Sequence, residues 1–419
     1  MRFDARAFQR ILLIVGLVLL SLWTAIWVKS VRKNHLETQK YSYIPAMPFL
    51  DVDFDINYYA TRAWITGSDP YQGYLRKGIG QLEAICKYDH PPVVLALFSW
   101  CLLVPHKLAV ILWLCMQTSV FSLAVYLCWR SRHQLDLLKV PLPLLMAATL
   151  LSYPVVAEME RGNWNMLVLL FLILSVWALR GRSLLCDSLA GTFAGIAAWI
   201  KMYPALLFLG FLALRRWRAA GFFAIAALLI GLANVRGVLE FAANIREPAV
   251  LTPDYLGTFV PWTHTVSGSW LLFCRTVHLN WLSQLPGAAG WGLLVFPLVL
   301  WVSYWILKIS NPSHLMYPYF LWLTAAATYL PPIANDYSLI FVPLAVWGVW
   351  DRRDRVLSHF LMILTLIWLQ PIWLPQSSAF LWFSKLISLA GVALILVRRA
   401  SEQINRASEG ERVEVVTVS

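Results

Sequence analysis

Apolar runs long enough to cross a membrane recur from one end of this chain to the other. Of the 419 residues, 59% are hydrophobic and 13% are charged, whereas a soluble domain carries about 25% charged residues. A helix crosses a hydrocarbon core of about 30 Å with its backbone groups bonded internally. The sequence therefore predicts an all-α polytopic membrane protein with about 12 transmembrane helices.

Several of the candidate spans are shorter than the roughly 20 residues of a full crossing, so their ends should extend into the polar flanks. The run at 91–105, with proline at both ends, fits a re-entrant or membrane-lying helix, although a crossing there would invert everything after it. The predicted spans are residues 11–28, 108–129, 140–157, 164–179, 189–200, 204–214, 221–235, 291–307, 317–330, 338–350, 356–369 and 379–397.

The net charge of +12 comes from short basic clusters between the apolar runs, which is the positive-inside pattern and not a nucleic-acid patch. We expect a bacterial-type inner (plasma) membrane protein with both termini cytoplasmic. The expected cytoplasmic loops are 130–139, 180–182, 215–218, 308, 352–355 and 398–399. The expected outer segments are 158–163, 201–203, 236–290 and 331–337.

The chain reads as one transmembrane domain, residues 1–397, followed by a short tail. Residues 398–419 are polar and without periodicity, so we expect a cytoplasmic, disordered tail. Three arginines precede the run 11–28 and no small-residue cleavage site follows it, which favours a retained first helix over a removed signal peptide.

The densest polar cluster is acidic and lies in the first expected outer loop. Asp51, Asp53 and Asp55 precede a segment of helical character, for which Asp55 can serve as the N-cap, and residues 67–71 form a turn that ends it. These carboxylates could solvate a loop, cap a helix, bind a divalent cation or perform chemistry. Because no second acidic cluster and no CxxC pair accompanies them, we expect no metal site.

Four motifs in order resemble glycosyltransferase family 87, the polyprenyl-phosphate-sugar-dependent membrane mannosyltransferases with the GT-C fold. They are Asp53-Phe-x-Ile-x-Tyr58 with Gly67-x-x-Pro70-Tyr71, then His90-Pro-Pro, then Arg161-Gly-Asn163-Trp-Asn165, and then Lys201-Met-Tyr203-Pro204. Residues 331–337 lie where the family often has Ser-Pro-x-Ser-Trp-x-His, and Tyr337 replaces the histidine.

The resemblance implies a GT-C fold with helical outer loops and an inverting transfer of a sugar, mannose above others, to a hydroxyl acceptor on a glycolipid or glycan at the outer face. A phosphate leaving group is stable as an anion, so one proton-accepting carboxylate suffices where glycoside hydrolases need a pair. The resemblance assigns that role to Asp53, with Asp55 and Asp51 as alternates, and implies no cofactor or metal.

The phosphate of the donor needs cations, and Lys201 and Arg161 are the candidates. Both could instead be interfacial anchors, and Asn163 and Asn165 could simply cap a helix. The candidate sugar-binding or acceptor-binding residues are His90, Asn163, Asn165, Tyr58, His264, Asp336 and Tyr337.

Two other functions remain open from the residues alone. A lipid-linked oligosaccharide ligase or polymerase would use a diphosphate donor and outer-loop arginines, for which Arg236, Arg246 and Arg275 are available. A transporter or flippase would place charged residues within the spans, and these spans contain almost no Asp or Glu.

Overall fold

We analysed a computed structural model of the chain. It describes residues 5–36, 52–77, 83–86, 88, 90–132, 141–245, 293–310, 312, 315–330, 336–349, 360–361 and 379–418, and the single residues 266, 270, 274 and 278.

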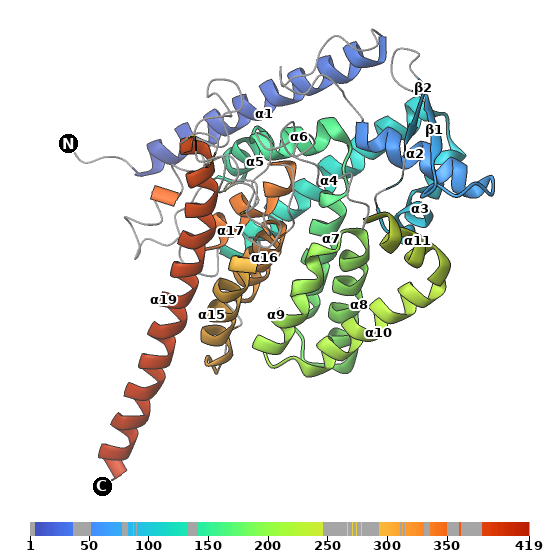
Figure 1. Ribbon diagram of the computed structural model, residues 1–419. Coiled ribbons are helices and arrows are strands. Elements are labelled where there is room, and N and C mark those ends of the chain that lie inside the picture. The colour runs from blue at the N-terminus through green and yellow to red at the C-terminus, as the bar shows by residue number, and fades with distance from the viewer. Residues whose placement is uncertain are drawn as a thin grey trace.

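The described part is helical apart from one small ribbon, so the predicted helical class is confirmed and the ribbon is an addition to it (Figure 1). β1 and β2 pair antiparallel, with Tyr74 opposite Cys86. The elements, with η for short 3-10 helices, are α1 (Ala5–Leu36), α2 (Val52–Ile65), β1 (Tyr74–Lys77), β2 (Glu83–Cys86), α3 (Pro92–Phe98), η1 (Ser99–Leu103), α4 (His106–Arg132), α5 (Leu142–Leu150), α6 (Tyr153–Arg161), α7 (Asn165–Ala178), α8 (Leu184–Ile200), η3 (Tyr203–Leu206), α9 (Leu207–Ala213), α10 (Trp217–Ala233), α11 (Val235–Ile245), α15 (Val295–Leu307), α16 (Met316–Thr328), η7 (Asp336–Ile340), α17 (Phe341–Val349) and α19 (Ala379–Val418).

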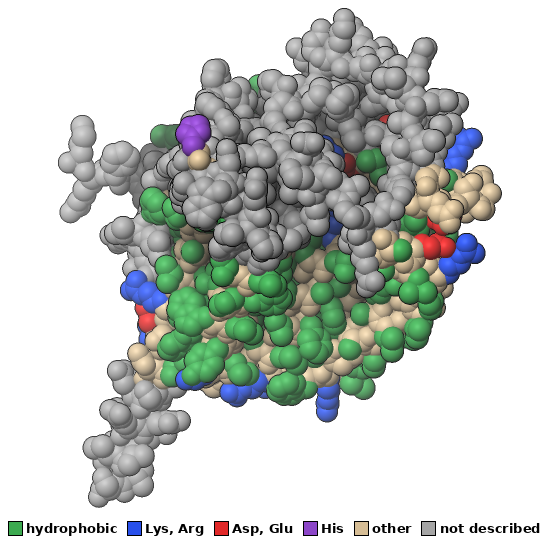
Figure 2. Space-filling view, viewed as in Figure 1, with side chains coloured by type: hydrophobic (Ala, Val, Ile, Leu, Met, Phe, Trp, Pro, Cys, Tyr) green, Lys and Arg blue, Asp and Glu red, His purple; other side chains and the backbone are tan. Residues whose placement is uncertain are grey.

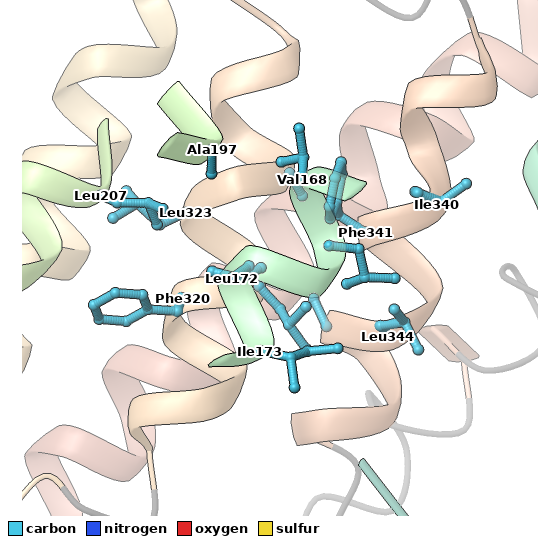
Figure 3. Close-up of a cluster of buried hydrophobic side chains, with 14 of the residues drawn as sticks. Val168, Leu172, Ile173, Ala197, Leu207, Phe320, Leu323, Ile340, Phe341 and Leu344 are labelled. Carbon is cyan, nitrogen blue, oxygen red and sulfur yellow. The ribbon is translucent and has the colours of Figure 1, made fainter. Parts of the chain in front are cut away.

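A core of buried hydrophobic side chains surrounds α7. Figure 3 shows side chains of α7 lying between those of α16 and α17. α16 is buried at nearly every position, as expected of a helix that is apolar on all sides. The core side chains are Val168, Leu172 and Ile173 of α7, Ala197 of α8, Leu207 of α9, Phe320 and Leu323 of α16, Ile340 of η7, and Phe341 and Leu344 of α17.

Helices α8 and α10 approach each other closely because glycines line their contact. A Cβ added at Gly191 would lie 2.3 Å from the carbonyl oxygen of Ala219, and one at Gly195 would lie 3.0 Å from the Cβ of Ala226. Small residues four apart let membrane helices approach this closely. The contact fixes the position of α8, whose C-terminal end carries Lys201.

Three of the basic loops lie together at one end of the bundle. Arg216 forms an ion pair of 2.7 Å with Asp187 and donates to the carbonyl oxygen of Gly181, while Arg215 donates to that of Leu307 at 2.9 Å. The loops 180–182, 215–218 and 308 therefore share an end, as the predicted topology requires. Which compartment this end faces stays a prediction.

The surface of the bundle is apolar, as a membrane protein's should be. Figure 2 shows hydrophobic side chains over the lower half of the visible face and Lys and Arg at its lower rim. By length and apolarity, one described helix, His106–Leu127, could cross a membrane, or two if the bent pair Trp217–Ala233 and Val235–Ala243 is one broken span. The count of about 12 crossings is thus not confirmed. Exposed apolar residues on α10 include Ile225, Leu228, Leu229 and Leu232.

Several expected boundaries were wrong or incomplete. The span 140–157 is two helices, α5 and α6, because the backbone is extended at Ser152 and Pro154 then occupies the first turn of α6, where its missing N–H breaks no bond. The predicted span 11–28 lies in α1, which packs on α5 and runs across the bundle (Figure 1). Residues 356–369 fall almost wholly outside the described residues.

Two further expectations concern short or polar segments. The run 91–105 forms α3 and η1, and the seven residues of α3 are too short to cross at 1.5 Å per residue, in keeping with a re-entrant or surface helix. The tail was expected to be disordered, but α19 continues to Val418. Polar composition alone did not reveal that the tail extends a helix already begun in the bundle.

Candidate active site

Helix α2 carries the acidic cluster into the protein. Asp53 and Asp55 both lie in its first turn, where a carboxylate interacts favourably with the helix dipole. The helix begins at Val52, so Asp55 is not its N-cap as the sequence suggested. The expected turn after α2 is confirmed, with Gly67 at a φ of 84°. Asp53 and Asp55 are only 6% and 3% exposed, so neither simply solvates a loop. Asp51 lies outside the described residues.

The Asp53 carboxylate is held by the end of α6. Arg161 reaches it through Nη2 at 2.6 Å and Nε at 3.1 Å, and the amide of Asn163 donates to it at 2.5 Å. Such a two-point contact is the strongest form of an Arg–carboxylate pair. Burial would raise the pKa of Asp53, but the Arg161 guanidinium, the Asn163 amide and the charge of Lys201 together hold it below its usual value.

A glycine turn brings Arg161 and Asn163 to α2. Gly162 ends α6 with a φ of 68°, a left-handed conformation that costs glycine nothing. A Cβ there would lie 2.8 Å from the Cβ of Phe54. The turn is also fastened to α4, because Trp113 donates to the carbonyl oxygen of Gly162 at 3.0 Å. Gly162 therefore sets how closely Asp53 approaches its partners.

We expect Gly162→Ala to destabilise the protein and to impair activity together. The left-handed backbone alone costs alanine about 1–2 kcal/mol, and the clash with Phe54 adds to this cost and pushes α2 away. Gly67→Ala is the matched control, because Gly67 also has a positive φ but nothing within 4 Å of an added Cβ. Thermal unfolding in detergent measures the loss of stability, and the rate of sugar transfer measures the loss of activity. Equal losses in the two variants would show that the approach of Phe54 is unimportant.

A second buried carboxylate, Glu158 on α6, interacts electrostatically with Asp53. Its oxygens accept from the backbone N–H of Asn165 at 2.7 Å, the amide of Asn165 at 2.8 Å and the N–H of Met166 at 3.3 Å. The amide oxygen of Asn165 accepts from the hydroxyl of Tyr203, and its nitrogen lies 3.4 Å from the hydroxyl of Ser338. Asn165 was predicted to bind sugar, yet its amide is bonded within the protein.

Lys201 lies at the C-terminal end of α8, with its side chain partly buried. Its positive charge acts on both buried acids, lowering the pKa of Asp53 and opposing the rise in that of Glu158. Among the residues that the structure describes, none forms a hydrogen bond or ion pair with the side chain of Lys201, whose backbone N–H donates to the carbonyl oxygen of Ala197 at 3.1 Å. The structure thus gathers Asp53, Arg161 and Lys201, which are far apart in sequence, into one charged cluster.

On the other side of Phe54, Asp55 contacts a residue that sequence reasoning missed. Its carboxylate lies 2.8 Å from Nε2 of His106, the first residue of α4. The His106 ring is edge-on to Tyr58, with centroids 4.7 Å apart. A histidine just after Pro105 at the start of an apolar run was the only signal for it. Tyr58, which was predicted to contact sugar or acceptor, therefore lies against His106, the partner of Asp55.

The remaining predicted residues lie further out or cannot be placed. The His90 ring is 5.5 Å from that of Tyr88, whose hydroxyl donates to Asn57, and Asn57 in turn donates to the backbone oxygen of Asp53. Asp336 lies on η7, which packs against α6. The side chains of Asp336 and Tyr337, and the whole of His264, Arg246 and Arg275, lie outside the described residues.

Neither a metal site nor the ligase alternative gains support from the described residues. Within that part of the chain, no three His, Cys, Asp or Glu side chains lie together as metal ligands would, and metal independence stays a prediction. Arg236, one of the arginines that kept a ligase open, is exposed and pairs with Glu240 on α11 at 2.7 Å.

The arrangement provides a buried carboxylate with cations beside it, which suits transfer of a group away from a phosphate. The sequence profile of glycosyltransferase family 87 matches residues 88–270, which include Arg161, Asn163 and Lys201. No curated protein matches the chain. The matched part begins after α2, and the contacts of Asp53 join α2 to it. The protein is a glycosyltransferase, and over these residues it is similar to glycosyltransferase family 87.

Proposed function

We propose that this glycosyltransferase takes a sugar, mannose by its resemblance to the family, from a polyprenyl-phosphate donor and passes it to a hydroxyl of a glycolipid or glycan. The observation that carries the proposal is the buried cluster in which Asp53 lies with Arg161 and Lys201. The apolar surface of the bundle supports a lipid-linked substrate that arrives from the bilayer.

In the proposed reaction, the acceptor oxygen attacks the anomeric carbon while the bond from that carbon to the phosphate oxygen breaks. The electron pair of the broken bond goes to the phosphate, and Lys201 and Arg161 stabilise the added negative charge. The acceptor proton passes to a carboxylate oxygen of Asp53. A single displacement inverts the anomeric configuration.

A carboxylate with a lowered pKa is a weak base, and this constrains the timing of proton transfer. An alcohol becomes strongly acidic once its oxygen bonds to the anomeric carbon. Asp53 can therefore accept the proton late, after most of the bond to phosphate has broken. The same lowered pKa keeps Asp53 ionised and ready at neutral pH.

The outer face is the proposed side for this chemistry. α7 and α8 run from the Asp53 cluster to the end that carries the loops 180–182 and 215–218. If those basic loops are cytoplasmic, the cluster faces outward. The proposed localisation is thus the inner (plasma) membrane, with the reaction on its periplasmic or outer side and no metal required.

Donor preference tests the proposed function. Purified protein in detergent should transfer sugar from polyprenyl monophosphate donors, with mannose preferred, and should not use polyprenyl diphosphate donors; a chelator should leave the rate unchanged. Lys201→Met should raise the KM for the donor about 10- to 100-fold, because a hydrogen bond to a charged group is worth about 1.5–3 kcal/mol.

Lys308→Met is the matched control, since Lys308 lies at the other end of the bundle over the ring of Tyr304. It should leave the donor KM unchanged. Transfer from diphosphate donors alone would favour the ligase reading and overturn the proposal. A donor KM equal in both variants would remove Lys201 from the phosphate site.

A further inference from the structure

Two buried carboxylates interact electrostatically in this cluster, and only one of them has a cationic partner in contact among the described residues. Asp53 is gripped by Arg161. Glu158 is 0% exposed, and its contacts are neutral donors, two from Asn165 and one from Met166. In the described part of the chain, Glu158 forms no ion pair. Burying a carboxylate without a paired cation strongly disfavours its charged form.

The groups that face Glu158 from the elements packed on it act in both directions. α2 presents the negative Asp53, which disfavours a second negative charge. α7 presents neutral Asn165, η3 presents neutral Tyr203, and Lys201 at the end of α8 is the one cation that opposes. Arg161 lies on α6, as Glu158 does, but it forms its ion pair with Asp53. From η7, Ser338 is neutral, and the side chains of Asp336 and Tyr337 are outside the described residues.

The balance favours the protonated acid. Burial is the largest cause and raises the pKa of Glu158 to about 8, in spite of the hydrogen bonds from Asn165 and the charge of Lys201. At neutral pH, most molecules therefore carry a proton on Glu158 and a negative charge on Asp53.

We infer that Glu158 is a positioning residue for the donor phosphate: as a buried neutral acid near the charged cluster, it leaves Lys201 and Arg161 with one positive charge more than Asp53 offsets. The inference rests on the proposed function. A sugar phosphodiester carries one negative charge, so the cluster with donor bound is neutral. After transfer, Asp53 holds the proton and the phosphate carries two charges, so the sum is again neutral. An ionised Glu158 would compete with the donor for Lys201.

Donor binding at several pH values tests this inference. Polyprenyl-phosphate mannose keeps one negative charge throughout, and it is titrated into the purified full-length protein without acceptor. The Kd should rise about tenfold from pH 7 to pH 9, because only the protonated fraction of Glu158 binds well. In Glu158→Gln, which is neutral at every pH, the Kd should stay constant.

Glu240→Gln is the matched control, because it makes the same change on partly exposed Glu240 of α11; it should keep the pH dependence of the unaltered protein. A merely structural role of Glu158 would change the Kd equally at all pH values. If the unaltered protein binds equally at pH 7 and pH 9, or if Glu158→Gln keeps the rise, the inference is overturned while the proposed function stands. If the donor binds at no pH, the proposed function fails first.

Discussion

Replacing Asp53 by asparagine should lower kcat by about 10²- to 10⁴-fold, the usual contribution of a positioned general base. Asparagine has nearly the shape of aspartate and can still accept a hydrogen bond from Arg161, but it cannot take a proton from the acceptor. The donor KM should not rise, because removal of a negative charge leaves the cations freer for phosphate. Initial rates of transfer at saturating donor and acceptor measure this.

Asp55 on α2 and Asp69 after the end of that helix serve as comparisons. Asp69→Asn should be near normal, because its contact is an accepted hydrogen bond from the N–H of Tyr71 at 2.9 Å, which an amide oxygen can also accept. Asp55→Asn should act mainly through His106, which it contacts. Near-normal transfer by Asp53→Asn, or a larger kcat loss in Asp55→Asn, would move the base away from Asp53.

Hydropathy predicted many helices to within a few residues but could not predict how they cross. The segment expected at 164–179 is α7, Asn165–Ala178, and that at 291–307 is α15, Val295–Leu307. The break at Ser152 was missed because apolar side chains continue on both sides of it. The apolarity of a segment predicts that it is removed from water. Whether the segment crosses the membrane or lies across its neighbouring helices, as α1 does, depends on packing.

The candidate active site was likewise predicted only in part from the sequence. Motifs singled out Asp53, Arg161, Asn163 and Lys201, and the structure places them in one cluster. Glu158 entered the sequence reasoning only as the edge of a loop, because a single acid in a polar loop looks solvated. Its burial comes from α7, η3 and η7, whose approach no local pattern encodes.

Replacing Arg161 by methionine should destabilise the protein by about 3–5 kcal/mol, because it leaves the Asp53 carboxylate buried without its partner. In the unaltered protein the pKa of Asp53 is lowered, so its contribution to stability is present above the unfolded pKa and is lost as the pH falls. In the variant, burial dominates and the pKa rises. The difference in stability should thus be largest at neutral pH and shrink in acid, which thermal unfolding in detergent at pH 4 to 7 can measure.

A double variant separates the pair from the arginine itself. The double variant Asp53→Asn with Arg161→Met leaves no buried carboxylate without its arginine. Its free energy of unfolding at pH 7 should therefore regain most of what Arg161→Met alone loses, although activity stays low. Arg236→Met is the matched control, because Arg236 is 83% exposed and its partner Glu240 stays in contact with water, so little should change. If the double variant were as unstable as Arg161→Met alone, Arg161 would act through packing, and Asp53 would not owe its ionised state to this contact. Recovery would show that the buried pair exists to keep one carboxylate charged where an isolated acid, such as Glu158, holds its proton.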